Sequence, residues 1–117
     1  MDPMLVSATP ADLDAELEDW GPRVGADRGT PLTSGRILHD ADGVQVGIWA
    51  CTPGSWELVE RPDTESIRLL AGRARLTNAA DGSSVELTVG DVLVLPKGWS
   101  GRWEILEDVR KLYVLSR

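Results

Sequence analysis

The sequence predicts an all-β fold, a sandwich or barrel of short strands, with one helix near the N-terminus. Twelve glycines and seven prolines in 117 residues imply frequent turns, and frequent turns imply short strands. Asp42-Gly43 and Asp81-Gly82 are hairpin dipeptides, and Pro53-Gly54 and Gly90-Asp91 mark further turns. The segment 83–89 alternates polar and apolar side chains, as a half-buried strand does. Many short strands at this spacing are typical of a sandwich or barrel.

The helix is expected at residues Thr9–Trp20. Its first residue can cap it, the proline that follows suits the first helical position, and acidic side chains crowd the first turns, where the helix dipole favours them. Leu13, Leu17 and Trp20 are spaced to lie on one face. Gly21-Pro22 then ends the helix, and the following dozen residues predict a loop.

From Gly35 onward the pattern indicates β structure throughout. We therefore divide the chain into an N-terminal arm, helix and loop (residues 1–34) and a β-barrel (residues 35–117). The strands are expected near Arg36–His39, Val44–Cys51, Trp56–Arg61, Glu65–Leu70, Ala74–Asn78, Ser84–Val89, Val92–Leu95, Gly101–Glu107 and Arg110–Leu115.

Composition excludes several classes of function. The formal net charge is −7 and the basic residues form no run, so the chain lacks the positive patch that nucleic-acid binding needs. The longest apolar stretch, residues 92–95, is far too short to span a bilayer. The N-terminus has no basic start and no apolar core, unlike a signal peptide. The single cysteine, Cys51, cannot form an internal disulfide, so a cytoplasmic location is expected.

Two glycine-framed segments resemble the paired motifs of the cupin superfamily. Glu65 and Gly72 have the glutamate-to-glycine spacing of the first motif, and Gly90, Pro96 and Gly98 fit the second motif without a gap. The phrases GIWACTPGSW, RWEILE and EDVRKLY further resemble small single-domain cupins related to ureidoglycine aminohydrolase and to the ethanolamine-utilisation cupin. The resemblance implies a small double-sheet jelly-roll barrel. It also implies sharp turns at Gly72 and Gly98.

The resemblance further implies a metal site, but the sequence carries one of its four expected ligands, Glu65. The histidine of the second motif is replaced by Gly101. Depending on the spacing, the two histidines of the first motif fall on Val59 and Arg61 or on Leu58 and Glu60. An arginine cannot lose its proton in a protein and would repel a divalent cation. We therefore expect no metal and no other cofactor.

Two other ligand sets are possible. The only histidine, His39, lies outside both motifs and is expected at the surface or in a hydrogen bond. Glu57, Glu65 and Glu104 could form an oxygen-only site for manganese or magnesium. Strand alternation weakens that site, because an inward Gly101 places Trp103 inward and Glu104 outward.

The same alternation predicts what fills the barrel. With Glu65 and Arg61 inward, Glu57 shares their face, Trp103 faces them and Trp49 lies near. Lys111 and Tyr113 share one side of the last strand. A few convergent charges among aromatic walls are typical of a small-molecule site. The candidate pocket residues are Trp49, Glu57, Arg61, Glu65, Trp103, Lys111 and Tyr113.

Structural roles remain open for each of these groups. Arg61 and Glu65 can be an internal ion pair that closes an empty cavity. Trp49 and Trp103 can be core residues, and Lys111 with Tyr113 an ordinary strand pair.

Three functions follow. The first is a metal-independent cupin that binds a small polar ligand. The second is a cupin hydrolase or isomerase resembling ureidoglycine aminohydrolase. The third is a dimeric scaffold. In each case the resemblance implies a homodimer, since small cupins commonly pair and sheet edges need covering. No catalytic residue is identified.

Overall fold

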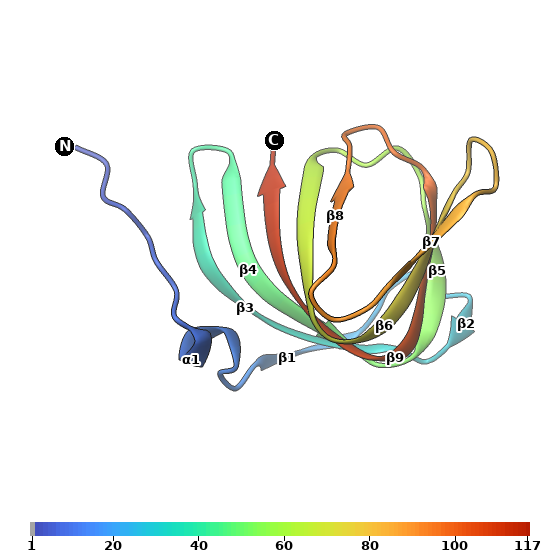
Figure 1. The fold of residues 1–117 in the computed structure, drawn as a ribbon, viewed down its shortest axis with the longest axis horizontal. Coiled ribbons are helices and arrows are strands. Elements are labelled where there is room, and N and C mark those ends of the chain that lie inside the picture. The colour runs from blue at the N-terminus through green and yellow to red at the C-terminus, as the bar shows by residue number, and fades with distance from the viewer. Residues whose placement is uncertain (1) are drawn as a thin grey trace.

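The computed structural model describes residues 2–117 and has a strongly curled antiparallel sheet with one short helix (Figure 1). Within this range the elements are α1 (Pro10–Leu13), β1 (Glu18–Pro22), β2 (Arg28–Gly29), β3 (Leu32–Ala41), β4 (Val44–Cys51), β5 (Gly54–Leu58), β6 (Thr64–Asn78), β7 (Ser84–Leu87), β8 (Val92–Leu95) and β9 (Gly101–Ser116). The curled sheet confirms the predicted jelly-roll barrel with a short helix.

Two long strands hold the barrel together. β9 pairs with β5 through its first half and with β4 through its second half. β6 pairs with β9 along most of its length and with β7 and β8 on its other side. The inward side chains of these strands form one apolar core, which includes Trp56, Ile67, Leu69 and Trp103. Burial of this core is the main stabilising contribution to the fold.

The expected turn at Gly72 is instead a bend inside one continuous strand. Residues Glu65–Leu70 and Ala74–Asn78, predicted as separate strands, both belong to β6. The register shifts at this bend, and Gly72 has a φ of +84°. A Cβ there would lie 2.1 Å from the carbonyl oxygen of Asp108, so only glycine fits. The bulge curves the strand without ending it. β9 likewise joins two predicted strands.

The predicted helix Thr9–Trp20 is wrong beyond its first turn. Thr9 and Asp12 form the capping box that starts α1, but none of the residues of α1 is buried. A helix this short has no packed face to stabilise it. The carbonyls of Leu13 and Ala15 accept hydrogen bonds from Arg110 Nη1 instead of extending the helix. Further along, residues 18–22 form β1, which pairs with β3.

The segment before Gly35 therefore contains the start of β3 as well as two whole strands, β1 and the short β2, which pairs with β5. Both were predicted as helix or loop. Of the predicted strands, Val44–Cys51 and Val92–Leu95 match β4 and β8. β5 ends at Leu58, three residues earlier than expected. No helix in residues 2–117 is long and apolar enough to cross a membrane.

Candidate functional site

An open pocket of about 230 Å³ lies inside the curled sheet. Six of the seven predicted pocket residues line it: Trp49, Arg61, Glu65, Trp103, Lys111 and Tyr113. Arg23, Gln45, Trp56, Leu58 and Leu115 complete the wall. The pocket thus combines three tryptophans with a small set of charged and polar groups.

Strand alternation explains how these side chains converge. On β9 every second residue points inward, which places Lys111, Tyr113 and Leu115 on one wall. Lys111 pairs with Trp49 of β4 on one side. Tyr113 pairs with Gly47, where a Cβ would lie 2.5 Å from the tyrosine hydroxyl. The glycine therefore makes the room that this ring occupies.

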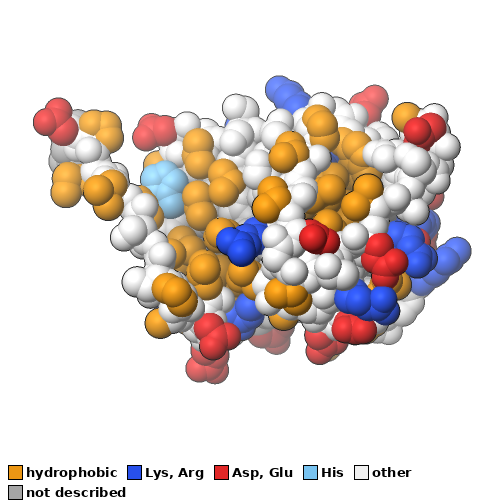
Figure 2. All heavy atoms as spheres, viewed as in Figure 1, with side chains coloured by type: hydrophobic (Ala, Val, Ile, Leu, Met, Phe, Trp, Pro, Cys, Tyr) orange, Lys and Arg blue, Asp and Glu red, His pale blue; other side chains and the backbone are white. Residues whose placement is uncertain are grey.

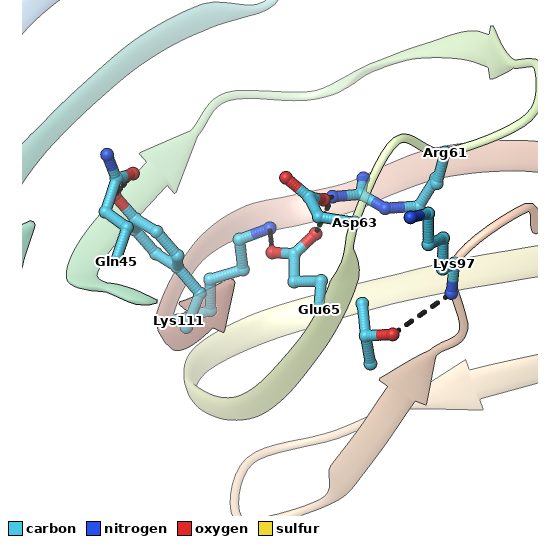
Figure 3. A network of polar contacts seen from close by, with 8 residues as sticks. Gln45, Arg61, Asp63, Glu65, Lys97 and Lys111 are labelled. Atoms are coloured by element: carbon cyan, nitrogen blue, oxygen red, sulfur yellow. Dashed lines mark hydrogen bonds and ion pairs between the residues drawn. The ribbon is translucent and has the colours of Figure 1, made fainter. Parts of the chain in front are cut away.

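A chain of ion pairs crosses the base of the pocket (Figure 3). Lys111 Nζ lies 2.7 Å from Glu65 Oε2, and Arg61 Nη2 lies 3.2 Å from Glu65 Oε1. The same Nη2 donates to Asp63 Oδ1 at 3.0 Å. Glu65 and Lys111 are only 4% and 7% exposed. Such burial is tolerable because each charge has a partner of opposite sign.

Aromatic rings surround the lysine of this network. The Nζ atom of Lys111 lies 4.4 Å from the ring centroid of Trp49 and 4.8 Å from that of Trp103. The negative faces of these rings attract the positively charged side chain. Tyr113 donates its hydroxyl to Gln45 Oε1 at 2.9 Å. Burial, followed by the charge of Glu65, raises the pKa of Tyr113, so the phenol stays neutral.

Arg23 is a pocket residue that the sequence reading missed. It follows β1, and its guanidinium carbon lies 4.9 Å from the ring centroid of Trp56. It forms no ion pair with any carboxylate among residues 2–117. Burial lowers its pKa. No sequence motif marks this arginine, because it reaches the barrel only through the pairing of β1 with β3.

Glu57, by contrast, does not line the pocket, and its predicted place there is wrong. Its side chain is 69% exposed and lies 3.3 Å from Arg102 Nη2 on the outside of the barrel. On β5 the alternation directs Trp56 and Leu58 inward instead. Glu60 then takes a φ of +48°, which interrupts the strand before Arg61. The inward position of Arg61 therefore does not imply, by strand alternation, an inward Glu57.

The donor set does not fit the metal that the resemblance implies. Glu65 is engaged by Lys111 and Arg61, whose positive charges disfavour a cation there. A Cβ on Gly101 would lie 2.1 Å from the carbonyl oxygen of Thr77 and 2.3 Å from the Trp99 ring, so no histidine fits that position. Across residues 2–117, no three His, Cys, Asp or Glu residues are grouped to hold a metal.

The other candidate ligands lie apart from the pocket. The side chain of Glu104 is 3.8 Å from Arg75 Nη1, away from Glu65. His39 lines a separate hollow beside Met4 and Val6 of the N-terminal arm. The Cys51 thiol is buried, and burial raises its pKa to about 11, so it is no nucleophile at neutral pH.

Comparison with solved structures gives the same fold in several proteins. A DUF861 family protein of unknown function from Pseudomonas syringae matches with a TM-score of 0.81 and 25% identity, over 90% of this chain and 46% of its own. This chain thus spans less than half of that relative. A putative ethanolamine utilization protein Q from Salmonella typhimurium matches with a TM-score of 0.67 and 22% identity, over 82% of this chain and 76% of its own.

The polyketide cyclase RemF from Streptomyces resistomycificus matches with a TM-score of 0.68 and 21% identity, over 97% of this chain and 80% of its own. At that identity the likeness concerns the fold alone. Comparison with curated proteins gives no match. The family model of the EutQ-like cupin domain matches residues 38–113, which include most strands of the barrel and nearly all of the pocket. The chain therefore belongs to the EutQ-like cupin domain family.

Proposed function

We propose that this cupin binds a small polar molecule in the aromatic pocket, without a metal ion. The observation that carries the proposal is a set of donors with unused capacity. Arg61 Nε is buried and has no hydrogen-bond partner among residues 2–117, and Arg23 has no carboxylate partner there. A buried donor left unsatisfied costs about 1–3 kcal/mol, which a ligand would recover once the Arg61 side chain turns Nε toward the pocket.

The pocket geometry also favours binding over a purely structural role. About 230 Å³ stays accessible above the ion pairs, and this space is open to the surface. Three tryptophans offer apolar area, and Gln45 offers an amide beside the Tyr113 hydroxyl. Apolar walls with few polar groups are the usual make-up of a small-molecule site.

Tryptophan fluorescence and amide NMR spectra can test this proposal. Metal-free protein in a buffer with chelator is titrated with a panel of small polar metabolites. We expect saturable shifts confined to residues around Trp49, Trp103 and Lys111. Arg61→Gln should weaken the binding of charged members of the panel, while Arg73→Gln, whose exposed side chain pairs with Glu86 elsewhere on the sheet, should not. Binding that appears only after a metal is added contradicts the proposal.

We also propose that the protein forms a homodimer through the outer face of the sheet. Cross-strand register places Val46, Val114, Ser66 and Val94 in one row on that face. Val94 is 52% exposed. Hydrophobic side chains gather over β3, β4 and the end of β9 beside the N-terminal arm (Figure 2). An apolar patch on the outside of the sheet can pair with its own copy about a two-fold axis.

Light scattering after size-exclusion chromatography tests the dimer. We expect a mass twice that of the chain, and a monomer for Val94→Glu, which places a charge on the outer face. Arg73→Gln serves as the control, because its side chain lies in the Glu86–Glu107 network. A monomeric wild-type protein at micromolar concentration contradicts this proposal.

A further inference from the structure

We propose that the pocket selects a small carboxylic acid in its ionised form, with an apolar or aromatic body. Arg23 and Arg61 hold the carboxylate, and the tryptophans cover the body. This inference rests on the proposed function and names the chemical class of its ligand.

The first argument is charge. Three cationic side chains, Arg23, Arg61 and Lys111, line the pocket with a single carboxylate, Glu65, which leaves a surplus of two positive charges. Asp63, bonded to Arg61, reduces the surplus to one. This positive site lies in a chain of formal net charge −7, so it is not a consequence of composition. A concave site of one sign concentrates counter-charged ligands.

The second argument is which donors are free. Lys111 is committed to Glu65 at 2.7 Å and is covered by the rings of Trp49 and Trp103. Arg61 uses Nη2 for its two carboxylates and leaves Nε without a partner. Arg23 pairs with no carboxylate in the described chain, and its Nη1 already donates to the Val24 carbonyl, so its remaining N–H groups are the ones that can serve a ligand.

The two arginines face the same pocket, and the planar guanidinium group matches a carboxylate in charge and shape. Burial is the main cause of the lowered pKa of Arg23. The positive charge of Arg61 lowers this pKa further, while Cys51 acts in the opposite direction. An anion between the two arginines would relieve this repulsion. A single carboxylate is therefore the group that the free donors can hold.

The third argument is the remaining wall. Trp56 and Trp103 stack with centroids 6.4 Å apart, and Trp49 meets the Trp56 ring edge-on at 6.1 Å. Leu58 and Leu115 add apolar area. The volume of about 230 Å³ exceeds the cavity of about 150 Å³ that holds benzene in an engineered protein. A ligand with one aromatic ring and a carboxylate therefore fits this volume. An inorganic oxyanion would leave most of the volume empty.

Benzoate and its neutral isostere benzamide test this class. Each is titrated into the 117-residue protein with chelator present, by calorimetry and tryptophan fluorescence. We expect benzoate to bind at one site per chain and benzamide at least tenfold more weakly. Arg23→Gln and Arg61→Gln should each weaken benzoate binding by about 10- to 100-fold, the range expected for a hydrogen bond to a charged group. Both should leave benzamide binding nearly unchanged.

Several outcomes separate this inference from the function on which it rests. Equal binding of benzoate and benzamide, or full benzoate affinity in Arg23→Gln, overturns the carboxylate class but leaves the pocket function standing. If inorganic phosphate binds as tightly as benzoate, the claim that the ligand has an apolar or aromatic body is wrong. Failure of both probes and of the metabolite panel overturns the function itself. Arg23→Gln is the decisive variant if Arg61→Gln does not fold, since Arg23 lies outside the ion network.

Discussion

Lys111 Nζ lies 2.7 Å from Glu65 Oε2 at the base of the pocket, beneath the rings of Trp49 and Trp103. Glu65 is the one residue that matches the metal ligands implied by the cupin motifs. In this chain its partners are an ammonium and a guanidinium group. Lys111 thus places a cation of the protein itself beside Glu65. The cupin motifs imply a metal ion next to this carboxylate.

The network predicts unequal costs for its two halves. Lys111→Met leaves Glu65 paired with Arg61 at 3.2 Å, whereas Glu65→Gln leaves Lys111 without any carboxylate partner. An uncompensated buried charge costs about 3–5 kcal/mol. We expect that loss in the free energy of unfolding for Glu65→Gln and a smaller one for Lys111→Met, both measured by urea denaturation.

Arg73→Gln is the control for these variants, because its ion pairs are about half exposed and should contribute less than about 1 kcal/mol. A larger loss for Lys111→Met than for Glu65→Gln would mean that the lysine, and not the carboxylate, is the hub of the network.

Restoring the missing histidine should not create a metal site. A Cβ at position 101 would meet the Thr77 carbonyl at 2.1 Å and the Trp99 ring at 2.3 Å. We expect Gly101→His to destabilise the fold by about 1–3 kcal/mol, as other overpacked sites do. Calorimetric titration with zinc should show no saturable binding at this site. A gain of one tightly bound zinc per chain contradicts the account.

The bend in β6 should be intolerant of any side chain. Gly72→Ala combines a φ of +84° with a backbone clash at 2.1 Å, whereas Gly82→Ala has a φ of +75° and open space around it. A left-handed alanine alone costs about 1–2 kcal/mol. We expect the free energy of unfolding, measured by thermal denaturation, to fall by that amount in Gly82→Ala and by clearly more in Gly72→Ala. Equal losses at the two positions would show that the bend relaxes easily.

Stability should fall at alkaline pH through Cys51. Burial raises the pKa of its thiol from 9.0 to about 11 in the folded protein. The folded state therefore holds the proton more tightly, so this contribution is complete below pH 9 and is lost as the pH rises toward about 11. Urea unfolding across this range should show the decline, and Cys51→Ala should reduce it. The raised pKa of Tyr113 acts in the same direction.

Much of the fold was predictable from local signals. Turn dipeptides and alternation located β4 and β8 to the residue, and alternation placed Trp103 inward and Lys111 on the same side of its strand as Tyr113. These predictions succeed because a strand in a barrel has one buried and one exposed face. The position of Glu65 in the pocket agrees with the glutamate position of the first motif.

The errors arise where long-range contacts decide the local structure. The helix stops at Leu13 because Arg110, distant in sequence, takes carbonyls that a helix would have used. Glu57 faces outward because the left-handed Glu60 breaks the alternation between it and Arg61. Arg23 enters the pocket from a loop that carries no periodicity, so no pattern could place it.

Metal content per chain tests the central claim most directly, the claim that a protein cation stands beside Glu65 where a metal would be held. The protein should be purified without a histidine tag and without chelator, and its metals determined by elemental analysis. We expect only traces of manganese, iron, nickel and zinc. A near-stoichiometric metal that is lost in Glu65→Gln would contradict this claim.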